Sequence, residues 1–311
     1  MIQQTAAPRT GREGGSTSFE GRPLADPTES LFDQGLAFDI QTLLSRRSVL
    51  KVAGLGALSA GLVSVAACSP SGSGASASGA EGTQLASPAS STAASAVTAD
   101  CSVIPEETAG PFPGDGSNGP DVLTQSGVVR KDIRSSFGTS TTAAAGVRLT
   151  IKLAVLDLGN ACKPLAGAAV YVWHCDREGR YSMYSNGVTN ENYLRGVQAV
   201  DADGIATFSS IFPACYSGRW PHVHFEIYPS LATATDPANR IATSQIALPE
   251  ATCKEVYATE GYSQSIANLG QVSLARDNVF GDDAGIHQVG AIAGSVAAGY
   301  TVELPVPVKS A

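Results

Sequence analysis

The sequence is poor in charged residues, and basic residues are in the minority. Only 15% of its 311 residues are charged, against about 25% in ordinary soluble domains. The chain has 20 Lys and Arg against 28 Asp and Glu, which gives a formal net charge of −8. Nucleic-acid binding needs a surplus of basic side chains to neutralise phosphates. The acidic balance therefore excludes nucleic acid as the main partner.

Long apolar runs are also missing. The uncharged run at residues 52–67 has sixteen positions, whereas a membrane-spanning helix needs about 20. The sequence shows neither long amphipathic helices nor an internal repeat. The run is thus too short to span a membrane, and the lack of helical periodicity argues against a helical architecture.

A pair of arginines, Arg46 and Arg47, precedes this short run, which ends in small residues before Cys68. A basic region followed by a short apolar region is typical of an export signal, and the end of the run resembles a bacterial lipobox. We predict that residues 45–68 are a twin-arginine signal with a lipobox. Cys68 would then carry a lipid anchor, and the protein would be an extracytoplasmic lipoprotein at the cell surface or membrane. The alternative is a buried helix with an incidental arginine pair.

The composition divides the rest of the chain. Residues 1–44 form a polar extension ahead of the arginines, which we predict to be disordered. In residues 69–100, Ser, Ala and Gly fill 22 of 32 positions, so this segment cannot bury enough apolar surface to fold and is predicted to be a flexible linker. Residues 101–311 remain as one folding domain, long enough for a good core.

The domain has the pattern of a β protein. Residues 148–155 alternate between apolar and polar side chains, and several other short runs are rich in β-branched and aromatic residues. Strands are predicted at 148–155, 168–173, 206–208, 223–228, 241–248 and 300–306. Short helices are predicted only at 250–259 and 272–280. Many short strands separated by Gly and Pro indicate a sandwich or a barrel.

Five cysteines follow Cys68, an odd number that leaves at least one thiol unpaired within the domain. In an exported protein cysteines are expected to form disulfides. The sequence does not select a pairing among Cys101, Cys162, Cys175, Cys215 and Cys253. Among these, we interpret Cys215 as one half of a disulfide.

Two of the four histidines, His222 and His224, are two residues apart. In a strand, residues i and i+2 point to the same face, so both imidazoles would converge on one metal ion. Glu226 follows on the same face and would complete a set of two histidines and one carboxylate for Fe(II) or Zn. However, Glu226 lies roughly 13 Å along a strand from His222. Cys215 is a second candidate, against which its expected disulfide argues.

Two tyrosines complete the site better. Tyr216 lies six residues before His222 in a segment with Pro and Gly, which predicts a loop able to fold back over the strand end. Tyr181 follows a predicted strand and a polar turn that contains Gly. The alternative for either residue is an ordinary packed tyrosine, and Tyr184 competes with Tyr181 for the same place.

The segments around these residues resemble the intradiol ring-cleavage dioxygenases. The similar segments are Val-Trp-His at 172–174 with Tyr-Ser at 181–182, then 194–198, 201–204, 213–219 and 222–225, together with 108–112 and 243–246. The resemblance runs from about residue 105 to 300, and its most specific part is the spacing of the two tyrosines and two histidines. The exported subgroup of the family, often preceded by a twin-arginine signal, fits best.

The resemblance implies a mainly β fold, a two-sheet β-sandwich with short helices and long active-site loops. It also implies a non-haem Fe(III) cofactor. Its ligands would be the phenolates of Tyr181 and Tyr216 and the imidazoles of His222 and His224. Tyr216 and His224 would be the axial pair. Fe(III) is a hard cation that favours anionic oxygen donors, and a bound cation lowers the pKa of a phenol.

The same resemblance implies catalytic roles for Tyr216, Arg219 and Gln245. Tyr216 would take a proton from the substrate, Arg219 would stand beside the substrate and stabilise developing negative charge, and Gln245 would be a polar group behind the metal. The substrates would be a small aromatic diol and O₂, and the product a muconate-type diacid. Catechol, hydroxyquinol and protocatechuate all remain open. The expected pocket lining comprises Thr108, Gly110, Pro111, Tyr184 and Trp220.

Two other functions compete with this interpretation. One is a different metalloenzyme, in which His222, His224 and a carboxylate bind Fe(II) or Zn. The other is a non-catalytic β-sandwich lipoprotein that captures aromatic or sugar ligands. The spacing of four potential ligands argues against the second, because a binding module does not need it.

Overall fold

The computed structural model describes residues 101–310 and two short strands, β1 (Ser18–Phe19) and β2 (Arg22–Pro23), which pair antiparallel. The predicted export signal at 45–68, the anchor on Cys68 and the linker at 69–100 lie outside the described residues, as does nearly all of the predicted extension at 1–44. Within the part of the chain that the structure describes, no helix is long and apolar enough to cross a membrane.

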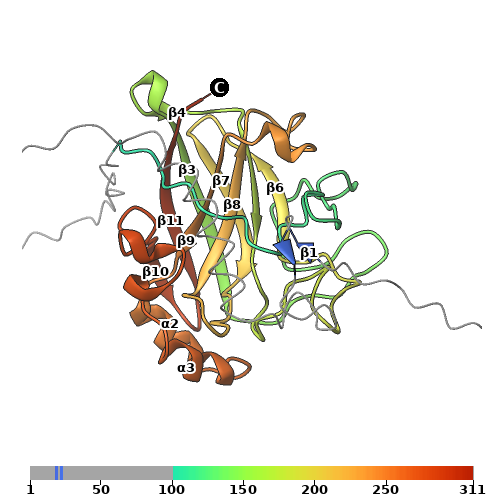
Figure 1. Ribbon diagram of the computed structural model, residues 1–311, viewed down its shortest axis with the longest axis vertical. Coiled ribbons are helices and arrows are strands. Elements are labelled where there is room, and N and C mark those ends of the chain that lie inside the picture. The colour runs from blue at the N-terminus through green and yellow to red at the C-terminus, as the bar shows by residue number, and fades with distance from the viewer. Residues whose placement is uncertain (1–17, 20–21, 24–100, 311) are drawn as a thin grey trace, which may run out of the picture.

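Two β-sheets stack face to face (Figure 1). The first has the order β10–β11–β3–β4, with β7 also paired to β3. Its strands are β3 (Arg148–Asp157), β4 (Lys163–Pro164), β7 (Ile205–Ile211), β10 (Ala291–Ser295) and β11 (Gly299–Val308). In this sheet β3 and β11 run parallel, and the other pairs are antiparallel.

The second sheet is antiparallel throughout and has the order β6–β5–β8–β9. Its strands are β5 (Ala169–Trp173), β6 (Arg195–Ala199), β8 (His222–Tyr228) and β9 (Ala242–Ala247). Apolar residues of both sheets, such as Ile151, Phe208 and Phe225, meet in one main core. The prediction of a mainly β, two-sheet sandwich is confirmed.

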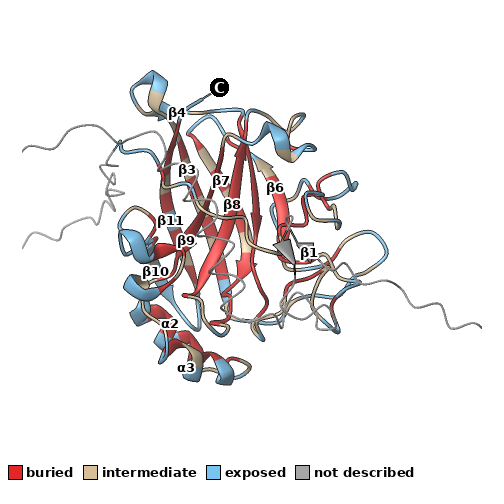
Figure 2. Cartoon of the chain, viewed as in Figure 1, coloured by how far each residue is buried: buried red, intermediate tan, exposed pale blue. Residues whose placement is uncertain are grey.

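The second sheet is buried on both faces. All seven residues of β8 are buried (Figure 2). Side chains alternate along a strand, so Val223, Phe225 and Ile227 enter the main core, whereas His222 and His224 lie on the opposite face. A second cluster covers that face. Its buried members include Val122, Leu123 and Val128 from the segment ahead of β3, with Tyr171, Trp173, Tyr181 and Tyr228.

Helices are few and short. Besides α2 (Glu250–Tyr257) and α3 (Ser263–Leu269), the described domain has the 3-10 turns η2 (Leu158–Asn160), η3 (Pro237–Asn239), η4 (Leu274–Arg276) and η5 (Phe280–Asp282). The helix predicted at 250–259 is confirmed. The helix predicted at 272–280 is wrong, because the carboxylate of Asp277 accepts the backbone N–H groups of Val279 and Phe280 and ends η4 in a turn. Sequence periodicity missed α3.

One disulfide joins Cys101 to Cys162, across 61 positions of the sequence. Cys175, Cys215 and Cys253 are free and buried. The prediction that Cys215 forms a disulfide is therefore wrong. Its sulfur lies in the main core, 3.5 Å from the carbonyl oxygen of Arg219.

Reduction of the Cys101–Cys162 disulfide should destabilise the domain. Closing a loop of this length restricts the unfolded chain, which is worth about 4 kcal/mol of the free energy of unfolding in the chain-entropy model. Urea unfolding with and without a reductant measures the loss. The Cys101→Ser/Cys162→Ser variant is the control and should not respond to the reductant. A wild-type protein equally stable with and without the reductant would contradict this expectation.

Candidate metal centre

The two histidines of β8 define the centre of the site. His222 and His224 are buried on the same face of the strand, and their Nε2 atoms are 3.1 Å apart. The indole of Trp173, directly across from His224 on β5, stacks on its imidazole with the ring centroids 4.8 Å apart and the planes 5° apart. Gly110 lies against the same imidazole, because a Cβ at that position would be 3.4 Å from Cε1 of His224.

Tyr216 reaches the centre from the loop between β7 and β8. Its hydroxyl oxygen is 3.2 Å from Nε2 of His222. Helix α3 holds this loop by two hydrogen bonds. The N–H of Cys215 donates to the Ser265 hydroxyl at 3.0 Å, and the Asn268 side chain donates to the Cys215 carbonyl oxygen at 2.8 Å. Helix α3 therefore fixes the position of Tyr216 over the start of β8.

Tyr181 approaches from the loop after β5. Its hydroxyl oxygen is 3.4 Å from Nε2 of His222, and its side chain is buried. The turn before it is closed by Asp176, whose carboxylate accepts the N–H groups of Glu178 and Arg180. The ring of Phe112 packs on Tyr181 at 4.7 Å between centroids. The predicted convergence of both tyrosines on the histidine pair is present in the structure.

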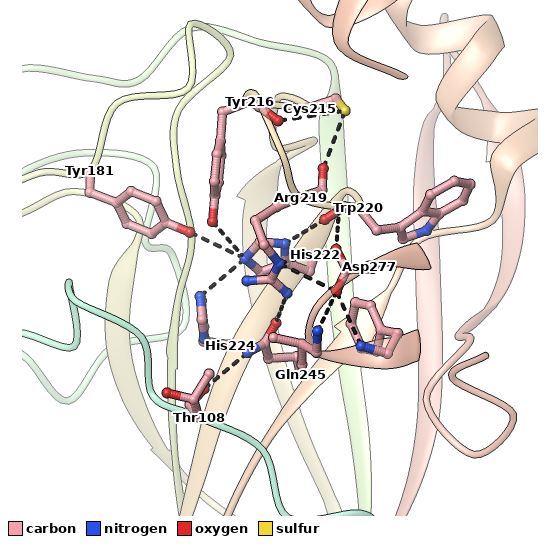
Figure 3. A network of polar contacts seen from close by, with 12 residues as sticks. Thr108, Tyr181, Cys215, Tyr216, Arg219, Trp220, His222, His224, Gln245 and Asp277 are labelled. Carbon is pink, nitrogen blue, oxygen red and sulfur yellow. Dashed lines mark hydrogen bonds and ion pairs between the residues drawn. The ribbon is translucent and has the colours of Figure 1, made fainter. Parts of the chain in front are cut away.

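Two neighbouring aromatic residues point elsewhere. The Tyr184 hydroxyl donates to the Asn118 side chain at 2.7 Å and accepts the Gly114 N–H at 2.8 Å, so Tyr184 does not replace Tyr181. The indole of Trp220 lies in the main core and donates to the Leu248 carbonyl oxygen at 2.9 Å. The expectation that Trp220 lines the pocket is wrong, because its indole points away from Tyr181 and Tyr216 (Figure 3).

Burial keeps the four donor groups neutral. It lowers the pKa of His222 to about 3, with a further contribution from Arg219, and lowers that of His224 well below its usual value. Burial also raises the pKa of Tyr216 to about 12 and that of Tyr181 well above 10. The positive charge of Arg219 opposes the rise for both phenols. A cation would therefore meet neutral phenols and imidazoles.

The tautomer of His222 suits a metal ligand. Its Nδ1 lies 2.5 Å from the Trp220 carbonyl oxygen, and a carbonyl oxygen only accepts, so Nδ1 carries the proton. The lone pair of Nε2 then faces Tyr181, Tyr216 and His224. A backbone carbonyl behind the ring is a frequent partner of metal-binding histidines. By contrast, Nδ1 of His224 is buried with no hydrogen-bond partner among the described residues.

Arg219 stands next to the centre within a polar network (Figure 3). Its Nε donates to Asp277 at 3.1 Å, and its Nη2 donates to the Gln245 side-chain oxygen at 2.7 Å. Gln245 in turn donates to the Thr108 carbonyl oxygen at 2.9 Å. Sequence reasoning named Arg219 and Gln245 but missed Asp277, which lies 58 positions beyond Arg219 and belongs to no motif.

The structure does not support a carboxylate as the third ligand. Within residues 101–310, no group of three or more His, Cys, Asp or Glu side chains is placed to hold a metal ion. Glu226 accepts the Tyr228 hydroxyl at 2.7 Å and lies 3.6 Å from Arg240. The donors that do converge are two phenols and two imidazoles. This set fits a hard cation that favours anionic oxygen together with nitrogen.

Comparisons with known proteins agree with this geometry. A family model described as Dioxygenase matches residues 118–234. An intradiol ring-cleavage dioxygenase from Tetranychus urticae is 25% identical over 67% of this chain and 95% of its own, with a TM-score of 0.54. A second dioxygenase structure is 24% identical over 68% of this chain and 95% of its own, also with a TM-score of 0.54. No curated protein matches the chain.

The resemblance to the intradiol ring-cleavage dioxygenases is confirmed, because both the family model and the similar structures are dioxygenases. The region that the family model matches contains Tyr181, Tyr216 and the histidine pair. Gln245 and Asp277 lie beyond it, so the network around Arg219 extends outside the matched region.

Acid should destabilise the metal-free protein through His222. The unfolded histidine titrates near 6.5, whereas the buried one has a pKa of about 3. Between these values the unfolded state binds a proton that the folded state excludes. The free energy of unfolding should therefore fall by about 1.4 kcal/mol per pH unit through this residue as the pH drops below about 6, and the contribution vanishes above pH 6.5. Urea unfolding across this range tests it, and a His222→Gln variant with an equally steep slope would contradict it.

Proposed function

We propose that the chain is an Fe(III)-dependent intradiol dioxygenase that cleaves a catechol-type ring with O₂. The bond between the two hydroxyl-bearing carbons breaks, and both oxygen atoms of O₂ enter the product, so that catechol and O₂ together give a muconate-type diacid. The observation that carries the proposal is the convergence of two tyrosines and two histidines in one buried centre. The similarity to intradiol ring-cleavage dioxygenases and the polar network around Arg219 support it.

The ferric ion would be held by Tyr181, Tyr216, His222 and His224. The bound ion supplies a Lewis acid that lowers phenol pKa values and draws electron density from the aromatic diol. The tyrosines bring the anionic oxygen that Fe(III) favours, and His222 brings a lone pair already oriented by the Trp220 carbonyl group. Each ligand comes from a rigid strand or from a loop anchored by hydrogen bonds.

The two tyrosines differ in burial, which supports different roles. Tyr181 is 2% exposed, whereas Tyr216 is only partly buried and lies on the loop over the strand end. We assign Tyr216 as the group that takes one hydroxyl proton of the substrate at its phenolate oxygen. Tyr181 would then remain an unprotonated phenolate. The loop position of Tyr216 provides the freedom that a proton acceptor needs.

Arg219 is the cation next to the substrate position. Arginine remains charged at any physiological pH, and the side chain of Arg219 is only 12% exposed. Among the described residues its Nη1 donates no hydrogen bond, while Nε and Nη2 are occupied. We therefore assign Nη1 to stabilise negative charge that develops on the ring carbon and the attacking oxygen. Gln245 orients the guanidinium through Nη2.

We also propose that the protein is exported by the twin-arginine route and held at the membrane by a lipid on Cys68. The disulfide between Cys101 and Cys162 supports this, because disulfides persist in oxidising compartments.

Oxygen uptake tests the proposed function directly. Iron-loaded protein should consume one O₂ for each catechol-type substrate in a panel of catechol, hydroxyquinol and protocatechuate, and give the corresponding diacid by mass spectrometry. It should also show the red-brown colour of tyrosinate-to-iron charge transfer. A colourless, iron-saturated protein that consumes no O₂ with any member of the panel would refute the proposal.

Two variants separate the tyrosine-based site from a carboxylate-based one. Tyr181→Phe removes a proposed ligand and should weaken Fe(III) binding by more than about tenfold, since even indirect partners of a metal cost that much, and should shift the charge-transfer band. Glu226→Gln is the matched control, because a glutamine still accepts the Tyr228 hydroxyl, and it should bind iron as the wild type does. The reverse result, intact metal binding in Tyr181→Phe and loss in Glu226→Gln, would favour the Fe(II) or Zn metalloenzyme.

A further inference from the structure

We propose that Asp277 is a positioning residue that fixes both Arg219 and His222 for the reaction. The inference rests on the proposed function, because it concerns how these two groups are held. Asp277 follows η4, and its side chain is fully buried. It touches neither of the proposed tyrosine ligands and lies outside every segment that suggested the activity.

The two oxygens of the Asp277 carboxylate differ in their main partners, although Nε of Arg219 lies within reach of both, 3.1 Å from Oδ2 and 3.4 Å from Oδ1. Oδ1 accepts the N–H groups of Val279 and Phe280 at 2.8 and 3.1 Å and so closes the local turn. Oδ2 faces the site and accepts the Trp220 N–H at 2.6 Å and the Arg219 Nε–H at 3.1 Å. The turn needs only the first oxygen. The second is therefore the one whose partners point to a role in the site.

The first connection leads to the guanidinium. Asp277 holds Nε of Arg219, and Gln245 holds Nη2 at 2.7 Å. The ring of Phe280, on the turn that Asp277 closes, lies 5.9 Å from the guanidinium carbon. With two nitrogens fixed on different sides, the plane of the guanidinium is determined. Nη1 then has one direction available, which is the arrangement expected for a group that acts on a developing charge.

The second connection leads through the backbone of one residue, Trp220, to the proposed metal ligand His222. The N–H of Trp220 donates to Asp277, and the Trp220 carbonyl oxygen accepts Nδ1–H of His222 at 2.5 Å. Trp220 therefore couples the position of the Asp277 carboxylate to the orientation of the His222 imidazole ring. A single side chain sets the orientation of the cation and of one imidazole, and the two cannot shift independently.

Asp277→Asn tests this role with little change in size. If the amide oxygen keeps the Val279 and Phe280 N–H groups, the amide NH₂ faces the donors of Trp220 and Arg219. If the amide is flipped, its NH₂ faces the Val279 and Phe280 N–H groups of the turn instead. In either orientation, one of the two pairs of donors loses its acceptor and faces the amide NH₂. The matched control is Asp283→Asn, because Asp283 also accepts a backbone N–H, that of Gly285, in an exposed turn of the same segment.

Proton exchange in the metal-free protein measures how firmly Asp277 holds Arg219 and, through Trp220, His222, and it does not depend on catalytic activity. In nitrogen-edited NMR spectra, the Nε–H of Arg219 and the Nδ1–H of His222 should exchange with water about tenfold faster in Asp277→Asn than in the wild type, because protection follows buried hydrogen bonds. Asp283→Asn should leave both rates unchanged. Wild-type rates in Asp277→Asn, with the Val279 and Phe280 N–H groups still protected and the amide NH₂ therefore facing Arg219, would overturn the inference. If those two N–H groups lose protection instead, the amide oxygen still faces Arg219, and Asp277→Ala, which has no acceptor, decides by the same two rates.

Kinetics of the iron-loaded protein provide the second measurement. A misplaced guanidinium should lower kcat by about 10- to 100-fold, whereas KM should change by less than about twofold, because Asp277 does not touch the substrate. The charge-transfer band should shift in Asp277→Asn and not in Asp283→Asn. A loss confined to thermal stability, with kcat and the band unchanged, would show that Asp277 only closes the turn and would overturn the inference.

The two proposals fail in different ways. If the wild type cleaves no catechol, the proposed function fails, and the exchange rates still decide whether Asp277 clamps Arg219. If Asp277→Asn does not fold, the exchange rates of the wild-type protein test the inference instead. Slow exchange of the Arg219 Nε–H relative to that of Arg134, whose partner Asp132 is exposed, supports the clamp, and equally fast exchange overturns it.

Discussion

His222 and His224 meet at 3.1 Å because they are two residues apart on β8, and this pairing requires β8 to be buried on both faces. One face is occupied by the core between the sheets. The other would expose two imidazoles to water unless another part of the chain covered it. The segment ahead of β3 supplies that cover and contributes Phe112, Val122 and Leu123.

A buried arginine holds the covering segment ahead of β3 against the site. Arg195 is 1% exposed and donates to the carbonyl oxygens of Pro113 and Ser182. It therefore joins the covering segment to the loop that carries Tyr181. Its hydrogen bonds go to carbonyl and hydroxyl groups, including that of Tyr171. A guanidinium presents five donors in a fixed fork, which lets this one side chain on β6 connect the covering segment, the loop that carries Tyr181 and strand β5.

Residues that act through local pattern were predictable from the sequence, and residues that act through tertiary contact were not. The alternation at 148–155 and the spacing of His222 and His224 express strand geometry, so the strands and the histidine pair follow from sequence alone. Asp277 has no such signal, because its partners are brought to it only by folding. The failed helix at 272–280 has the same origin, since its apolar spacing is helical but the Asp277 carboxylate captures the N–H groups that would continue it.

The chemistry of the donors explains how such a buried centre can fold before a cation binds. Carboxylates gathered at this depth would repel one another or have to be protonated. Phenols and imidazoles are neutral here, and they hydrogen-bond to each other, as Tyr181 and Tyr216 do with His222. Nε2 of His222 has a single lone pair and accepts one hydroxyl proton at a time, and Nδ1 of His224 has no hydrogen-bond partner among the described residues. Charge would be created only when a cation replaced the phenol protons, so the proposed site would keep the ligands that Fe(III) favours in a neutral form until the ion binds. The positive charge of Arg219 lowers the pKa of both phenols and so assists that exchange. The pairing of Arg219 with Asp277 limits the repulsion between its guanidinium and an incoming cation.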